Sequence, residues 1–514
     1  MSETPSAAAP PGPPGASDRL DRGILVLGLV IVSGTIMAIL DTTIVNVALK
    51  TLGHDFKTDL STIQWVVTGY MLALGTVIPL TGWAVDRFGG RRVWMTSIVL
   101  FVAGSALSGA AWNIESLIVF RVLQGLGGGM LMPTGMAILS MAAGPRRMGR
   151  VMSIVGVPML LGPILGPVIG GWLVDNADWR WIFLVNVPVG ALALALAWWR
   201  IPAGEPHEGR AALDLRGLVL LPPAFALSIY GLSQANAHGF GSPDTYGWLA
   251  AGAVLIALFV AHSLQRGDRA LIDVRLFADR TFATASVAVL LVGVALIGSL
   301  LLLPLYYQTA RGETAFAAGL LLAPQGLGAA LAMPVAGQLT DRLGAGRVVP
   351  FGIVLLTLGT IAFTQVSAGT SYWLLSGALF VRGLGLGATM MPTMSSAIAT
   401  LPQRAVARAT SSLNIIMQLG GSLGSALLAV LLSRQIGDRL PQASGSHGGF
   451  GDIPEAVRVK VAPLLAESFH APFWLALGLT AALIVPALLL PRRGARHLPH
   501  EPAAEQVPEV APHL

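Results

Sequence analysis

The 514-residue chain contains no cysteine and few charged residues. Without cysteine it has no disulfide framework, no thiolate metal site and no cysteine nucleophile. Asp, Glu, Lys and Arg make up 11% of the sequence, less than half of the share of about 25% that is usual in soluble domains. A soluble enzyme, a coiled coil and a disordered chain are therefore excluded for the protein as a whole.

Apolar residues dominate the sequence instead. They make up 54% of the chain, and the mean hydropathy is +0.71. They stand in continuous blocks of about 20 residues, the length that a helix needs to cross a bilayer, and do not alternate with polar residues as in a β-barrel. The pattern predicts an all-α integral membrane protein with fourteen spans. Their approximate ranges are 22–49, 62–85, 92–111, 115–143, 149–174, 180–200, 215–234, 247–265, 282–305, 317–340, 347–366, 373–399, 408–434 and 471–491.

Basic residues predict the orientation of these spans. With both termini in the cytoplasm, the inner segments carry 22 Lys and Arg residues and the outer segments carry 8, while Arg121 and Arg382 lie inside spans. This excess agrees with the positive-inside rule. The net charge of +6 does not indicate nucleic acid as a partner, because the basic residues are spread over many short loops. The Pro-rich segment 1–21 and the polar segment 492–514 are expected to be disordered cytoplasmic tails.

The only long outer loop, 435–470, leaves two interpretations open. Its first half is rich in Gly and Ser and is expected to be flexible. A surface insertion is the favoured interpretation of its second half, and a short interfacial helix is the alternative.

An internal repeat divides the chain. The segment 82–92, GWAVDRFGGRR, recurs 255 residues later at 337–347 as GQLTDRLGAGR, and the Met-Pro-Thr of 132–134 recurs at 391–393. A third match, at an offset of 258, aligns the fifth and the thirteenth spans. Spans 1–6 therefore match spans 9–14, and spans 7 and 8 are an insertion. Parallel halves of this kind are a transporter architecture with the substrate cavity between them.

The repeat defines the predicted domains. An N-terminal six-helix bundle covers 22–200, a linker with two additional transmembrane helices covers 201–281, and a C-terminal six-helix bundle covers 282–491. The additional pair is expected to lie outside the two bundles.

Further motifs follow in a fixed order along the first half. They are LDTTIVNVAL at 40–49, QWVVTGY at 64–70, RVLQG at 121–125, Gly162-x-x-x-Gly166-Pro167-x-x-Gly170-Gly171, and WRWIFLVNVPVG at 179–190. On these motifs and the 82–92 loop, residues 22–491 resemble the major facilitator superfamily, and more narrowly its fourteen-span drug:proton antiporter family of EmrB/QacA-like multidrug exporters. The resemblance implies two six-helix bundles plus two helices. One departure is Lys50, where that family usually has proline.

Asp41 is the only carboxylate that lies well inside a predicted span. A charge at that depth costs about 2.5–3.5 kcal/mol on insertion scales, so membrane-embedded acids are functional by default. Arg121 lies at a similar depth of roughly 9–12 Å from the outer side, counted at 1.5 Å per residue. We expect the two to form a proton-coupling pair, and the resemblance assigns Arg121 to proton transfer. The alternatives are an Asp41 bonded to Thr42 or Thr43 and an Arg121 that extends outward.

The second half serves as an internal comparison. The repeat places Ser299 near the position of Asp41, and Arg382 at a depth similar to that of Arg121. Because this half offers no acid there, we expect proton coupling in the N-terminal half and a structural role for Arg382.

Two motifs are expected to serve conformational change. The basic inner loop contains Gly82, Asp86, Arg87, Gly89, Arg91 and Arg92. Gly89 permits a tight turn, and Asp86 is expected near the N-terminus of span 13, where a helix dipole favours an anion. The resemblance implies a gating role, and a cluster that only sets topology is the alternative. The second motif, in span 5, consists of Gly162, Gly166, Pro167, Gly170 and Gly171. It is expected to allow close helix packing and to bend the span, and the resemblance links it to export.

Six side chains are candidates for the substrate cavity, although each alone is more readily explained by an interhelical hydrogen bond than by a ligand contact. They are Asn46, Tyr70, Gln124, Gln325, Asn414 and Gln418. The sequence shows no phosphate-binding loop, no metal cluster and no nucleophile–base arrangement. An enzyme is therefore not expected. With no cofactor the energy must come from an ion gradient, which we expect to be the proton motive force.

The sequence predicts a proton-coupled antiporter that exports lipophilic or cationic drugs across the bacterial cytoplasmic membrane. An exporter dedicated to one natural product, antibiotic or lipid is the alternative. A membrane sensor or membrane enzyme is disfavoured by Asp41 and the antiporter motif. The expected partners are small-molecule substrates, protons, the lipid bilayer and an accessory membrane-fusion protein.

Overall fold

The computed structural model describes residues 22–78, 80–143, 162, 165–201, 214–238, 242–267, 270–399, 403–440 and 455–490. All regular elements among these residues are helices, which confirms the prediction of an all-α fold. The predicted tails lie outside the described residues.

Most of the predicted spans are long apolar helices. Eleven helices among the described residues are long and apolar enough to cross a membrane, and a twelfth span is formed if α3 (Trp65–Val77) and α4 (Leu80–Phe88), bent by 54°, are taken together. The shorter α15 (Ala345–Ile361) and the helical residues 165–176 lie where the two other spans are predicted. The count of fourteen fits this arrangement.

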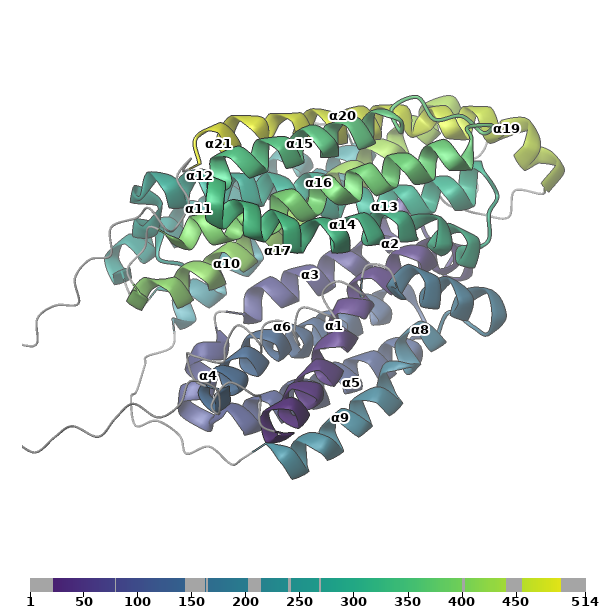
Figure 1. Ribbon diagram of the computed structural model, residues 1–514. Helices are drawn as coiled ribbons and strands as arrows, with labels where there is room; N and C mark the ends of the chain where they lie inside the picture. The colour runs from purple at the N-terminus through teal and green to yellow at the C-terminus, as the bar shows by residue number, and fades with distance from the viewer. Residues whose placement is uncertain are drawn as a thin grey trace, which may run out of the picture.

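Figure 1 shows two helical bundles side by side. The N-terminal half contains α1 (Arg22–Asp55), α2 (Leu60–Ile63), α3, α4, α5 (Gly90–Gly109), α6 (Ile114–Ala143), residues 165–176, α8 (Trp181–Leu184) and α9 (Asn186–Arg200). The C-terminal half contains α12 (Arg280–Val292), η4 (Gly293–Ile297), α13 (Gly298–Leu305), η5 (Tyr306–Ala310), α14 (Ala315–Leu343), α15, α16 (Tyr372–Ala399), α17 (Gln403–Arg439), α20 (His470–Ala482) and α21 (Ile484–Leu488).

The sequence repeat has a matching backbone geometry. Gly89, between α4 and α5, has φ 81° and ψ 144°, and Gly344, between α14 and α15, has φ 83° and ψ 152°. Both glycines adopt positive φ, which residues with a side chain rarely do. The tight turn predicted at Gly89 is therefore present in both halves.

The two halves pack together at one end. A single apolar core there contains residues of both halves, among them Leu49 and Leu52 of α1 and Leu302 and Tyr306 of the C-terminal half. Towards the other end each half has its own apolar core. One surrounds Trp94 in the N-terminal half, and the other lies within the C-terminal half. We call the shared end, which carries Lys50 and Gln308, the outer end, following the predicted orientation.

The inserted helices α10 (Leu215–His238) and α11 (Pro243–Arg266) pack against each other and lie beside the junction of the halves. Leu221 and Ile229 of α10 share an apolar cluster with Leu72 of α3 and with Ile415 and Leu419 of α17. The pair therefore touches both halves. A 3-10 helix, η3 (Val274–Ala278), follows it and leads into α12.

In the second half of the long outer loop, residues Glu455–Ser468 form helix α19. Leu465 and Ala466 are buried in the shared outer core, and α19 contacts η5, α17 and α20. The structure therefore has the helix that we held as the alternative, packed against the C-terminal half, and not the favoured surface insertion. The Gly-rich first half of the loop falls largely outside the described residues.

Candidate functional site

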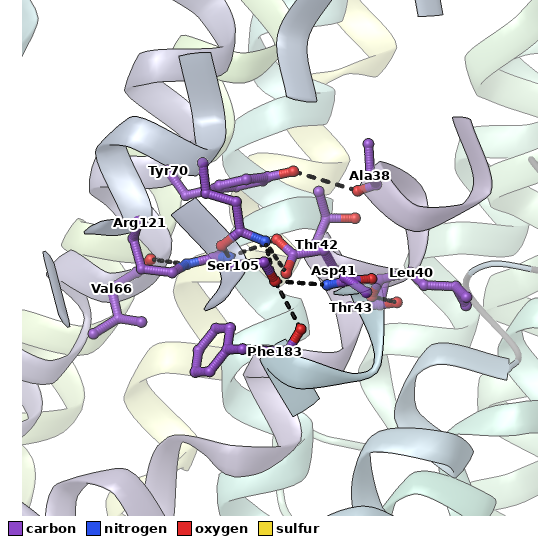
Figure 2. Close-up of polar contacts among 12 residues, drawn as sticks. Ala38, Leu40, Asp41, Thr42, Thr43, Val66, Tyr70, Ser105, Arg121 and Phe183 are labelled. Carbon is purple, nitrogen blue, oxygen red and sulfur yellow. Dashed lines mark hydrogen bonds and ion pairs between the residues drawn. The ribbon is translucent and has the colours of Figure 1, made fainter. Parts of the chain in front are cut away.

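Asp41 and Arg121 form a buried ion pair between α1 and α6 (Figure 2). Asp41 Oδ2 lies 2.5 Å from Arg121 Nη1, and the two side chains are 0% and 1% exposed. Neither charge can therefore be solvated by bulk water, and each depends on the other and on nearby polar groups. The structure brings together the two residues that the sequence singled out.

Gln124 completes a ring of hydrogen bonds with this pair. It lies one helical turn after Arg121 and hence on the same face of α6. Its Oε1 accepts a bond of 2.7 Å from Arg121 Nη1, and its Nε2 donates one of 2.9 Å to Asp41 Oδ1. Gln124, which is predicted as a substrate-cavity residue, is fully buried and fixes both members of the pair.

The guanidinium of Arg121 is held from two further sides. Its Nε donates a bond of 3.1 Å to the carbonyl of Val66, and its Cζ lies 4.0 Å from the ring centroid of Tyr70. Phe183 lies on another side, with 5.5 Å between Cζ and its ring centroid. An aromatic face stabilises a cation, more strongly where water is excluded. Tyr70, another predicted cavity residue, thus belongs to the surroundings of Arg121 in this structure.

Two residues of the site were not singled out from the sequence. Ser105 Oγ accepts bonds from Gln124 Nε2 at 3.1 Å and from Asn186 Nδ2 at 3.0 Å, and donates to the carbonyl of Phe183 at 2.8 Å. All these side chains are buried. Asn186 stands in a quoted motif, but a single Ser in a long apolar span gives little signal. These bonds link α5, α6 and the start of α9.

This arrangement allows a proton to bind at Asp41 without leaving Arg121 unpaired. Protonation neutralises the carboxylate and removes its attraction for the guanidinium. Arg121 still has Gln124 Oε1, the Val66 carbonyl and the Tyr70 ring as partners. A buried carboxylate whose counter-ion has neutral partners in reserve is suited to reversible proton binding.

The glycines of the antiporter motif hold α1 in place. A Cβ at Gly162 would lie 2.2 Å from Ile39 Cγ2, and one at Gly166 would lie 1.8 Å from Thr43 Oγ1. Gly170 faces Ile44 in the same way. The motif therefore packs against the turns of α1 on either side of Asp41. Gly171 and Pro167 lie against α14 of the other half, next to Ala315 and Gly319.

The second half contains the counterpart that the repeat predicts. Arg382 of α16 donates through Nη2 to Ser299 Oγ and through Nη1 to Gln325 Oε1, the latter bond being 3.0 Å. Gln325, predicted as a cavity residue, thus partners Arg382. Arg382 and Ser299 occupy the places of Arg121 and Asp41, so the pair is present without its acid.

The remaining cavity candidates have less specific surroundings. Asn46 Nδ2 donates to the Thr42 carbonyl, and Asn414 Nδ2 donates to the Thr410 carbonyl, each at 3.0 Å and within its own helix. Gln418 is half-buried, and its Cβ lies 3.5 Å from where a Cβ of Gly75 would be. It therefore lies where α17 meets α3 of the other half.

The basic inner loop is anchored within the N-terminal half. Arg91 Nη2 donates a bond of 2.5 Å to the Trp198 carbonyl, and Arg91 lies over the Trp198 ring. Asp86, Arg87 and Arg92 are exposed, and α4 packs against α3, α5 and α6. The side chains near the start of α17 are outside the described part of the chain, so the contact expected for Asp86 stays a prediction.

The sequence is similar to those of known proteins. Residues 31–425 match the family model described as Major Facilitator Superfamily. The chain is 42% identical to a "Multidrug resistance protein B homolog" of Mycobacterium tuberculosis, over 96% of this chain and 95% of the relative. It is 31% identical to the "Putative multidrug resistance protein MdtD" of Cronobacter sakazakii, over 82% of this chain and 89% of the relative.

A solved structure has a similar fold. The fold is similar to that of a bacterial homolog of the human lysosomal transporter Spinster, with a TM-score of 0.63 and 18% identity, over 92% of this chain and 98% of that chain. The match to the family model covers well over half of the chain. The chain therefore belongs to the major facilitator superfamily and is a multi-pass membrane transporter, not an enzyme.

Proposed function

We propose that this transporter exports lipophilic or cationic drugs across the bacterial cytoplasmic membrane in exchange for protons. The observation that carries the proposal is the buried ring of Asp41, Arg121 and Gln124. An ionisable group inside a membrane protein is costly. When Asp41 is ionised, the ring provides partners for both charges. When Asp41 is protonated, the ring still provides a partner for Arg121. Reversible proton binding at Asp41 therefore explains why a charged pair is placed inside the membrane.

The cycle follows from the contacts of Asp41. A proton that enters from the outer side binds an Asp41 carboxylate oxygen and breaks the ion pair with Arg121. The substrate is displaced and released outward at that stage. The proton leaves Asp41 when the site faces the cytoplasm, and the ionised site then binds the next substrate and carries it outward. The cationic substrate and the proton both bind to the negative charge of the Asp41 carboxylate and therefore exclude each other. This competition is the basis of antiport.

The names of two relatives support drugs as substrates, since both are described as multidrug resistance proteins. An orientation with both termini in the cytoplasm is part of the proposal and rests on the positive-inside count. An accessory membrane-fusion protein is a further proposed partner. Export of a single natural product remains the second candidate, and a panel of unrelated dyes separates it from multidrug export.

Ethidium export from everted membrane vesicles tests the proposal. Vesicles with the wild-type protein should accumulate ethidium when respiration supplies a proton gradient, and an uncoupler should abolish this accumulation. Asp41→Asn should behave as vesicles without the protein. Asp55→Asn is the matched control, because Asp55 lies on the same helix and accepts a bond from Trp179 Nε1 away from the site. Uncoupler-insensitive accumulation would rule out the proton mechanism.

A further inference from the structure

Arg382 is a buried cation without an acidic partner among the described residues. Its side chain is 2% exposed. Nη2 donates to Ser299 and Nη1 to Gln325, while Nε has no hydrogen-bond partner. Both partners are neutral. A buried charge is stable only when it is paired and hydrogen-bonded, so this guanidinium lacks the anion that its surroundings should supply.

The other half shows what the missing partner would be. Arg121 has the carboxylate of Asp41 at 2.5 Å, and the corresponding place beside Arg382 holds the hydroxyl of Ser299. The N-terminal site is neutral as a pair when Asp41 is ionised, whereas the C-terminal site carries a net positive charge. A positive site inside a membrane protein is expected to serve a ligand or an ion pathway.

Two of the helices around Arg382 also contact the N-terminal half. Ser299 lies on α13, which packs against α1. Gln325 lies on α14, whose Gly319 meets Pro167 of the N-terminal half. Both helices that supply partners to Arg382 therefore also face the interface between the halves. Transporters of this architecture bind their substrates near the bilayer midplane at that interface.

We propose that Arg382, with Ser299 and Gln325, forms a subsite for a carboxylate of the transported substrate. Arginine binds carboxylates through two parallel hydrogen bonds, and Nε with one Nη supplies such a pair once the interface opens. Asp41 would serve the cationic end of the same substrate. The inference rests on the proposed export of drugs and extends its substrate class from cations to zwitterions.

Two dyes that differ in one group test the subsite. Tetramethylrhodamine carries a free carboxylate, and its methyl ester carries none. Their affinities are measured by fluorescence anisotropy with the purified full-length protein in nanodiscs of neutral lipid, without a proton gradient. Arg382→Gln should weaken the acid by about tenfold, the value of one charge-assisted bond, and leave the ester unchanged or tighter. The binding assay is independent of proton coupling, so its outcome is separate from that of the ethidium experiment.

A second variant restores the missing acid. Ser299→Asp places a carboxylate against Arg382 and should exclude the acid dye while sparing the ester. Ser395→Asp is the matched control, because it adds the same charge to the exposed side of α16 and should change the ratio of the two affinities little. A merely structural Arg382 predicts an equal loss of both dyes.

A chloride titration separates two sources of anion. If the site serves a substrate carboxylate, chloride should weaken the acid dye no more than ionic screening does. Displacement of the acid by chloride alone would mean that an inorganic anion occupies the site, and would overturn the proposal. Equal affinity changes for both dyes in Arg382→Gln, or no binding of either dye to the wild-type protein, would also overturn it.

Discussion

Lys50 of α1 and Gln308 of η5 join the two halves by reciprocal hydrogen bonds. Lys50 Nζ donates to the Gln308 carbonyl at 2.9 Å, and Gln308 Nε2 donates to the Val47 carbonyl at 2.8 Å. Nearby, Asp175 of the N-terminal half accepts bonds from the backbone N–H groups of Ala315 and Phe316. Those N–H groups are at the start of α14, where the helix dipole favours a negative charge. These contacts close the outer end.

Lys50→Met should therefore favour opening of the outer end. Loss of one bond from a charged donor should shift the ratio of open to closed outer ends by about tenfold. The chain has no cysteine, so spin labels can be placed at Ala177→Cys and Gly369→Cys in the natural background. Both positions are exposed at the outer end, one in each half. The label distances should move towards longer values.

Lys57→Met is the control for this prediction. Lys57 is an exposed lysine just beyond α1, and its replacement should leave the distances unchanged. Identical distance distributions for Lys50→Met and the wild-type protein would show that the reciprocal bonds do not hold the outer end closed.

Gly166→Ala should destabilise the protein and impair transport. The added Cβ would overlap Thr43 Oγ1 and approach Thr43 Cβ within 2.9 Å, so α1 must shift near Asp41. Overpacking of this kind costs about 1–3 kcal/mol. Thermal unfolding of the purified protein gives the stability. Gly377→Ala introduces a methyl group inside α16 with no atom within 4 Å and should be tolerated. Equal unfolding temperatures for the two variants would contradict the close packing.

A pH-dependent contribution to stability is expected from Asp214, directly before α10. Burial acts to raise the pKa of this carboxyl, but hydrogen bonds from His262, Gly217 and Leu271 lower it below its ordinary value of 3.8. Because the pKa is lower in the folded protein, the stabilisation is complete above that ordinary value and is lost as the pH falls through the folded pKa.

Asp214→Asn should therefore lower the unfolding temperature at neutral pH, and the difference from the wild-type protein should shrink in strong acid. Asp244→Asn, in the first turn of α11, is the control and should have the smaller effect. A difference that stays constant from neutral pH into strong acid would mean that the Asp214 carboxylate does not supply the stabilisation.

Much of the fold could be predicted because hydrophobic blocks and charge bias are local properties of the sequence. The depths of Asp41 and Arg121, counted in residues, were enough to predict that they meet. The repeat likewise matched Ser299 to Asp41 and placed Arg382 at the depth of Arg121, and in the structure these two side chains are hydrogen-bonded. These inferences needed only the rise of a helix per residue and the sequence repeat between the two halves.

Other contacts could not be predicted because they depend on how distant helices pack. Lys50 and Gln308 are 258 residues apart, and in the sequence Lys50 was only a departure from a family pattern. Tyr70 and Gln124 were assigned to a cavity because polar side chains within spans look alike until their neighbours are known. Ser105 was not considered for the same reason. The turns of π-helix at η4 and η5 also leave no clear mark in the sequence.

The central claim is that Asp41 carries the proton that exchanges for substrate. Its most direct test is proton release on addition of tetramethylrhodamine methyl ester to the purified protein in weakly buffered solution, followed with a pH indicator. At dye concentrations that saturate each protein, the wild-type protein should release protons as the cationic dye binds. Asp41→Asn, which lacks the charge that attracts the cation and binds it more weakly, should release none, while Asp55→Asn should release protons as the wild type does. Undiminished proton release by Asp41→Asn would contradict the account.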